Sequence, residues 1–175
     1  GTVEQSEYDT ILSEMQLRQE KMRQFLSHTE DIQYYASRYF NHDSIFFIGR
    51  NLDYAMGLEG SLKLKEISYI HSEAYASGEL KHGTISLIEP LFDKAMSNVV
   101  EVKARGAEVL ALTTEDFREK MEKTADATVS VPVTHPMLQP SLGVVPLQLF
   151  AYYVALQRGC DIDKPRNLAK SVTVE

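Results

Sequence analysis

Apolar and polar residues follow each other along this chain in blocks that predict helices and short strands in turn. Apolar positions at helical spacing indicate a helical segment over residues 7–39, with a break at residues 28–31 where Thr29 can cap the second half. The short apolar run Ser44–Ile48 ends in a turn that begins at Gly49. An apolar run of that length between polar turns is typical of a buried parallel strand.

The alternation continues to the end of the chain. The pattern predicts helices over 53–70, 92–105, 114–123 and 142–158, and strands over 85–88, 108–112 and 127–131. Alternating units of this kind predict an α/β fold whose parallel sheet is covered by helices on both faces. The sequence shows no repeat or linker. We therefore expect a helical N-terminal segment, residues 1–40, that leads into one domain over 41–175.

Composition narrows the functional classes. A net charge of −7 without any basic cluster argues against nucleic-acid binding. No apolar run is long enough to span a membrane, and Cys160 is the only cysteine, which excludes an internal disulfide and a cysteine-based metal cluster. No histidine pair has a metal-ligand spacing. We expect a reducing, cytoplasmic setting and, because the chain opens on Gly1, an excised piece of a longer protein.

The helix predicted over residues 53–70 carries polar residues on two sides. At about 100° per residue, Glu59, Lys63 and Glu66 fall in one narrow arc that aliphatic residues flank. An ordinary amphipathic helix needs only one polar face. The opposite side carries a second polar stripe, which consists of Ser61, Lys65 and Ser68.

Two interpretations of the Glu59–Lys63–Glu66 row remain open from spacing alone. Two carboxylates with an ammonium between them suit proton transfer, since a partly desolvated Glu can accept and return a proton near neutral pH. The same spacing also produces an ordinary surface ladder of ion pairs. Structural ion pairs are common, so spacing by itself favours the ladder.

Two further segments carry candidate chemistry. His82 lies in a loop bracketed by two glycines, where it is either an exposed turn residue or a ligand contact with a pKa near working pH. The polar C-terminal stretch after Cys160 is either a frayed end or a tail that folds over the site. In the second case Lys170 would supply an amine or a fixed positive charge.

Residues 58–83, LEGSLKLKEISYIHSEAYASGELKHG, and the terminal PRNLAKSVTVE resemble the sugar-isomerase (SIS) domains of the glucosamine-6-phosphate synthases, which are glutamine–fructose-6-phosphate aminotransferases. The match runs from FFIGR to the last residue and is most similar to the second, C-terminal SIS domain. The resemblance implies a flavodoxin-like three-layer α/β/α sandwich. It also implies transfer of ammonia to fructose 6-phosphate and isomerisation to glucosamine 6-phosphate, without metal or organic cofactor.

The resemblance also implies a role for individual residues. Glu66 corresponds to the base that moves a proton between sugar C1 and C2, with Lys63 beside it. His82 corresponds to the ring-opening histidine, which enters the site from the partner subunit of a homodimer. Lys170 corresponds to the tail lysine that meets the open-chain sugar near C2, and Ala169 to a backbone contact next to it.

With the resemblance, we interpret the Glu59–Lys63–Glu66 row as part of a site in which Glu59 binds substrate. We also expect the C-terminal tail to be ordered. The family's phosphate-binding serine/threonine loop belongs to its first SIS domain and does not occur here, nor does the glutaminase domain that releases ammonia. Family members also carry another strand after the HGT segment, whereas this chain passes from Ile88 through Pro90 into Phe92. Deleting a central strand would break the layer packing. We therefore expect the protein to have about a dozen residues between Ile88 and Phe92 that this sequence lacks.

Two rival functions remain. A sugar-phosphate-sensing SIS module that binds without turnover would need the fold but not Glu66, Lys63 and Lys170 together, so the presence of all three favours the enzyme. A different sugar-phosphate isomerase or deglycase with a related domain is disfavoured by the PRNLAKSVTVE ending.

Overall fold

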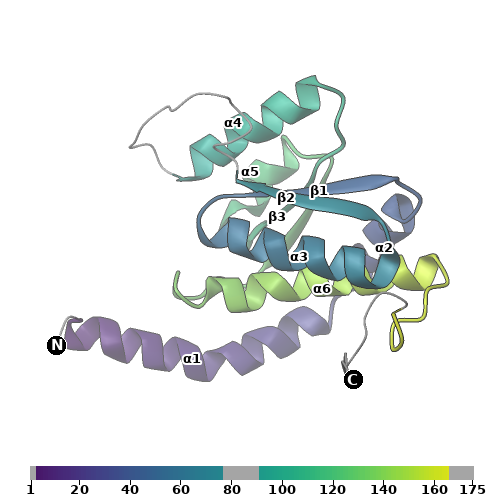
Figure 1. Ribbon diagram of the computed structural model, residues 1–175. Helices are drawn as coiled ribbons and strands as arrows, with labels where there is room; N and C mark the ends of the chain where they lie inside the picture. Colours follow the sequence, from purple (N-terminus) through teal and green to yellow (C-terminus); the bar gives the residue numbers. More distant parts are fainter. Residues whose placement is uncertain (1–2, 77–90, 166–175) are drawn as a thin grey trace, which may run out of the picture.

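The computed structural model describes residues 3–76 and 91–165 (Figure 1). Within them, helices and parallel strands alternate, which confirms the α/β class. In chain order the elements are α1 (Gln5–Leu26), α2 (Glu30–Tyr39), β1 (Ser44–Gly49), α3 (Leu52–Ser68), β2 (His71–Ala76), α4 (Leu91–Ala104), β3 (Leu110–Thr114), the 3₁₀ turn η1 (Glu115–Phe117), α5 (Arg118–Glu122), β4 (Ala127–Val131) and α6 (Gln139–Gln157).

The described strands form two separate parallel pairs. β1 pairs with β2, with Phe47 opposite Ala74, and β3 pairs with β4, with Leu112 opposite Val129. Within the described residues each pair is a two-stranded sheet, and the parallel pairing agrees with the prediction. Figure 1 shows α3 and α6 on one side of the strands and α4 and α5 on the other, so the three-layer order is kept.

One hydrophobic core connects the two sheets through α6. Val129 of β4, Leu64 of α3 and Val154 of α6 belong to the same buried cluster. The helix α6 is apolar nearly all round because α2, α3 and β4 all pack against it. Gly60 permits close packing of α3, since a Cβ there would lie 2.9 Å from the Phe47 ring and about as close to α6.

The N-terminal helix α1 is fixed to the domain by a small polar cluster. Lys21 bonds both the Glu14 carboxylate and the carbonyl of Val133, and the Thr134 hydroxyl also donates to Glu14. The hydrogen bonds from Lys21 and Thr134 lower the pKa of Glu14. Further along α1, Phe25 is buried in the shared core. The predicted break between the two N-terminal helices is confirmed, with Thr29 at the N-cap of α2 but without a capping bond from its side chain.

Strand β2 was absent from the sequence prediction. The helix predicted over 53–70 ends at Ser68, because the next residue, Tyr69, adopts a left-handed conformation with a φ of 61°, and β2 begins at His71. The inward position of β2 is taken by Ser72, whose hydroxyl donates to Ser61, so the strand lacks an apolar signal there. The predicted strand at residues 85–88 lies outside the described residues.

Later boundaries agree more closely with the prediction. The strand at 127–131 is confirmed residue for residue, and α4 ends just before Gly106, which adopts a φ of 85°. The preceding strand begins at Leu110 instead of residue 108. The reason is that the Val109 N–H donates to the Asp126 carboxylate. Val109 thus uses its N–H group for a side chain and not for the backbone of β4.

We expect Leu64→Ala to lower the free energy of unfolding by about 2–5 kcal/mol, because it would leave a cavity in the core. Leu64 is fully buried, whereas Leu62 on the same helix is 52% exposed. Leu62→Ala is therefore the matched control and should change stability by less than about 0.5 kcal/mol. Urea denaturation measures both values. Equal losses in the two variants would mean that α3 does not pack in the orientation described.

Candidate active site

The polar row predicted on the long helix exists on one side of α3. Lys63 Nζ donates to Glu66 Oε2 over 2.8 Å, one turn apart. The Glu66 side chain is only 17% exposed, so this pair is half-buried and not a mobile surface contact. One turn earlier, Glu59 accepts a hydrogen bond of 3.4 Å from the side-chain amide of Gln148 on α6. The Glu59 end of the row therefore contacts α6.

The electrostatics of the row assign different properties to its members. The hydrogen bond to Glu66 raises the pKa of Lys63, and the nearby charge of Glu59 acts in the same direction. Lys63 is consequently an ammonium at neutral pH and cannot serve as a base there. It is a fixed positive charge beside a carboxylate. The proton acceptors of this row are therefore the carboxylates of Glu59 and Glu66.

The second polar stripe of α3 is not a solvated face. Ser61 and Ser68 are buried, and only Lys65 is exposed. The Ser68 hydroxyl donates to the carbonyl of Leu64 in the preceding turn, and Ser61 accepts from Ser72 of β2. Small hydroxyl groups that satisfy their bonds locally can occupy a helix–sheet contact. The row at Glu59 is therefore the half-buried polar face of α3, and the serine side packs inward.

The turn after β1 brings the start of α3 very close to the strand end. A Cβ at Gly49 would lie 2.4–2.5 Å from backbone atoms of Asp53 and from the nitrogen of Tyr54, so only glycine fits. Asn51 follows with a φ of 51° and a ψ of −117°, a positive-φ conformation outside the left-handed helical region. In α/β folds, ligands bind at the carboxyl ends of strands, where this turn lies.

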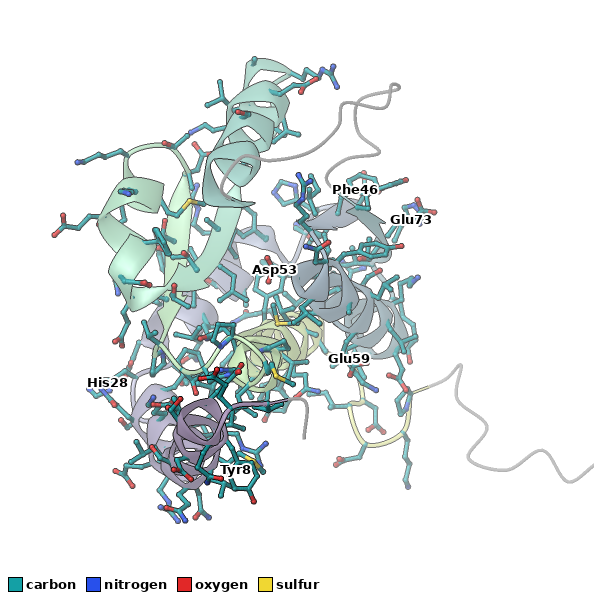
Figure 2. All side chains as sticks on the ribbon, turned by 90° about the vertical axis from the view of Figure 1, so that its left-hand side faces the viewer. Tyr8, His28, Phe46, Asp53, Glu59 and Glu73 are labelled. Atoms are coloured by element: carbon teal, nitrogen blue, oxygen red, sulfur yellow. The ribbon has the colours of Figure 1, made fainter. Side chains whose placement is uncertain are left out.

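Asp53 is a candidate that the sequence reasoning missed. It retains contact with solvent, yet desolvation by the protein around its carboxyl group raises its pKa. Figure 2 shows Asp53 pointing from α3 toward the side of the molecule where β3 and β4 lie. A carboxylate two residues after a turn at a strand's carboxyl end was the available signal. Gln148 was also missed, because α6 is apolar nearly all round and the sequence gives no signal that this glutamine contacts the row.

The row does not line either of two cavities among the described residues. One, of about 530 Å³, lies at the C-terminal ends of α3 and α6, where Tyr69, Arg158 and Cys160 contribute to its wall. The other, of about 630 Å³, lies between α1 and the start of α6, beside Met15 and Ser141. The members of the Glu59–Lys63–Glu66 row are partly exposed to solvent and lie outside both of these cavities.

Three predicted site residues lie outside the described residues, namely His82, Ala169 and Lys170. The structure thus brings together Glu59, Lys63 and Glu66, and the placement of the other three stays a prediction. Among the residues described, no group of three or more His, Cys, Asp or Glu side chains could hold a metal ion. No helix in the same ranges is long and apolar enough to cross a membrane.

Comparisons with known proteins identify the family to which this chain belongs. The SIS domain family model matches residues 38–158. A glutamine–fructose-6-phosphate aminotransferase (isomerizing) from Caldanaerobacter subterraneus subsp. tengcongensis is 50% identical over 187 residues, which covers all of this chain and 31% of the relative. The corresponding protein of Clostridium acetobutylicum is 48% identical with the same coverage. The chain therefore spans about a third of the length of these relatives.

A shorter relative and a solved structure complete the comparison. A protein of the same name from Sphingobium yanoikuyae is 48% identical over 143 residues, which are 75% of this chain and 92% of that protein. The C-terminal domain of glucosamine-fructose-6-phosphate aminotransferase from Francisella tularensis superimposes with a TM-score of 0.81 at 30% identity, over 91% of this chain and 48% of that one. The chain belongs to the SIS domain family and matches the C-terminal part of the isomerizing glutamine–fructose-6-phosphate aminotransferases.

Proposed function

We propose that this chain is the isomerase-half fragment of an enzyme that makes glucosamine 6-phosphate from fructose 6-phosphate and glutamine. The observation that carries the proposal is the half-buried Lys63–Glu66 pair of 2.8 Å, in a row with Glu59 on α3. The names of the relatives supply the substrate and the reaction. A half-buried carboxylate beside a fixed ammonium suits proton transfer on a sugar.

In the proposed reaction, Glu66 takes the proton from sugar C1 and returns it to C2 after the amino group is bound there. Lys63 stabilises the negative charge that develops on the sugar oxygens while the proton is in transit. Glu59, bonded to Gln148, orients the sugar hydroxyls along α3. The chemistry needs a proton acceptor, a fixed charge and substrate positioning, and no metal or organic cofactor takes part.

The rest of the site would come from groups that complete the open row. His82 opens the sugar ring from the partner subunit of a homodimer, and Lys170 and Ala169 approach the open chain near C2. A first SIS domain holds the phosphate, and a glutaminase domain supplies ammonia. The share of the relatives that this chain leaves uncovered is large enough for both domains. By itself, the 175-residue chain is inactive in this scheme.

The proposal is tested by Lys63→Met and Lys65→Met in the full-length protein that contains this domain. Both lysines lie on α3, but Lys65 is exposed on the other side of the helix. Removing the Lys63 charge should lower the synthase kcat by at least about tenfold, since transition-state charge loses a stabilising partner. Lys65→Met should leave kcat within about twofold.

A steady-state assay of glucosamine 6-phosphate formation measures the kcat of both variants. Circular dichroism checks that both are folded. If the two variants have the same kcat, the row is an ordinary ion-pair ladder. In that case the alternative of a regulatory SIS module that binds sugar phosphates without turnover becomes the better one.

A further inference from the structure

The polar row on α3 offers Lys63 two carboxylate partners. Glu59 precedes Lys63 by one helical turn and Glu66 follows it by one turn, so both carboxylates are within reach of the ammonium group. On an isolated helix, a pair in which the glutamate comes four residues before the lysine is better than one in which the lysine comes first. Helical geometry by itself therefore favours the pair of Glu59 with Lys63.

The structure contains the other pair. Lys63 Nζ donates to Glu66 Oε2 over 2.8 Å, and within residues 3–76 and 91–165 no ion pair joins Lys63 to Glu59. The hydrogen bond to Glu66 raises the pKa of Lys63, and the charge of Glu59 adds to this effect. Glu59 is thus close to Lys63 without being bonded to it. The partner of Lys63 differs from the one that α3 alone would favour.

The contact that orients Glu59 comes from α6. The side-chain amide of Gln148 donates to Glu59 Oε1 over 3.4 Å. This distance is long for an N–H···O bond, but a charged acceptor makes such a bond roughly twice as strong as one between neutral groups. Because the amide is neutral, it orients the Glu59 carboxylate without cancelling its charge. The ammonium of Lys63 then remains available to Glu66.

The close approach of α3 and α6 brings Gln148 to this position. A Cβ at Gly60 would lie 3.1 Å from Cδ1 and 3.2 Å from Cβ of Leu147, so the two helices are nearly in contact there. Glu59 and Gln148 are the sequence neighbours of this glycine and this leucine. In Figure 2, Glu59 lies beside the packed helices α3 and α6. The bond to Glu59 is therefore a consequence of how the two helices pack.

We propose that Gln148 is a positioning residue of the Glu59–Lys63–Glu66 row, and that it makes Glu66 the partner of Lys63 by holding Glu59 toward α6. As a role in catalysis this rests on the proposed function, in which the ammonium of Lys63 has to stay beside the Glu66 carboxylate. Without Gln148, Glu59 is free to pair with Lys63 in the arrangement that the helix favours. The ammonium then moves toward the preceding turn and away from Glu66.

Nuclear magnetic resonance on the 175-residue chain identifies the partner of Lys63 directly. A scalar coupling across the hydrogen bond, from the ζ nitrogen of Lys63 to a carboxyl carbon, distinguishes Glu66 from Glu59. In the unmodified chain the coupling should be to Glu66. Gln148→Met removes the donor and keeps a side chain of similar length. The coupling to Glu66 should then fall by at least about twofold, and a coupling to Glu59 should appear.

Gln157→Met is the matched control. Gln157 is exposed at the end of α6, about two and a half turns beyond Gln148 and therefore on the opposite side of the helix. The coupling between Lys63 and Glu66 should be unchanged in this variant. An unchanged coupling in Gln148→Met, or a coupling of Lys63 to Glu59 in the unmodified chain, would overturn the proposal.

The catalytic consequence is measured in the full-length protein that contains this domain. Gln148→Met should lower the synthase kcat by at least about fivefold, since the charge of Lys63 moves away from Glu66. In a Glu59→Gln background the competing carboxylate is gone. Adding Gln148→Met to that background should change kcat by less than about twofold. Equal losses in both backgrounds would mean that Gln148 has a merely structural role, and the proposal would be wrong.

The two measurements distinguish a failure of this proposal from a failure of the proposed function. If the coupling moves from Glu66 to Glu59 while kcat stays the same, Gln148 selects the partner of Lys63 as proposed, and it is the proposed function that fails. If kcat falls while the coupling stays with Glu66, Gln148 acts in another way and the proposal is overturned.

Discussion

Glu66→Gln in the full-length protein should reduce synthase turnover by about two to four decades, the usual contribution of a general base. Glutamine keeps the shape and still accepts a hydrogen bond from Lys63, but it cannot take up a proton at neutral pH. The Lys63–Glu66 pair is half-buried, and its members lie one turn apart on the same helix, so its geometry should be preserved. Steady-state kinetics of glucosamine 6-phosphate formation would measure the loss.

Three controls distinguish a lost base from a damaged domain. The KM for fructose 6-phosphate should change little, and hydrolysis of glutamine should survive because that chemistry lies in another domain. Glu119→Gln, on the exposed surface of α5, should keep the full synthase rate. Normal turnover in Glu66→Gln would remove this carboxylate from the mechanism and leave the row without a proton acceptor other than Glu59.

The 175-residue chain by itself should neither bind fructose 6-phosphate with micromolar affinity nor convert it. The row supplies two carboxylates and one ammonium, so it carries a net negative charge, and Asp53 at the start of the same helix adds to it when ionised. A sugar phosphate brings about −1.5 to −2 charges of its own. Phosphate sites depend on hydroxyl and backbone N–H donors, often at a helix N-terminus. In the proposed function these donors belong to the first SIS domain.

Loss of phosphate binding should affect catalysis as well as affinity, because the remote group holds the reacting carbons in position. Isothermal titration of the chain with fructose 6-phosphate and glucosamine 6-phosphate measures the first effect. A coupled isomerisation assay measures the second. The full-length protein, titrated under the same conditions, is the positive control. Micromolar affinity in the short chain would mean that these residues contain their own phosphate site, and the two-domain scheme would be wrong.

The sequence by itself determined most local features of this domain. Helical geometry was enough to place Glu59, Lys63 and Glu66 on one arc, since positions three and four apart always share a helix face. Gly106 and Gly159 marked helix ends, and both adopt the positive φ that glycine tolerates best. Each of these properties depends on a few neighbouring residues. They can therefore be deduced without knowing what lies across the core.

Other features depended on contacts between distant residues, and only the tertiary structure decided them. The serine side of α3 is buried because Ser72, eleven residues after Ser61, presents a hydroxyl to it. Glu59 is held by Gln148, 89 residues away, and desolvation at Asp53 depends on the chain that surrounds it. Among the described residues, the pairing of β1 with β2 and of β3 with β4 joins distant segments, which local propensity does not encode. A hydrophobic pattern indicates which residues are buried, but their partners are set by the fold as a whole.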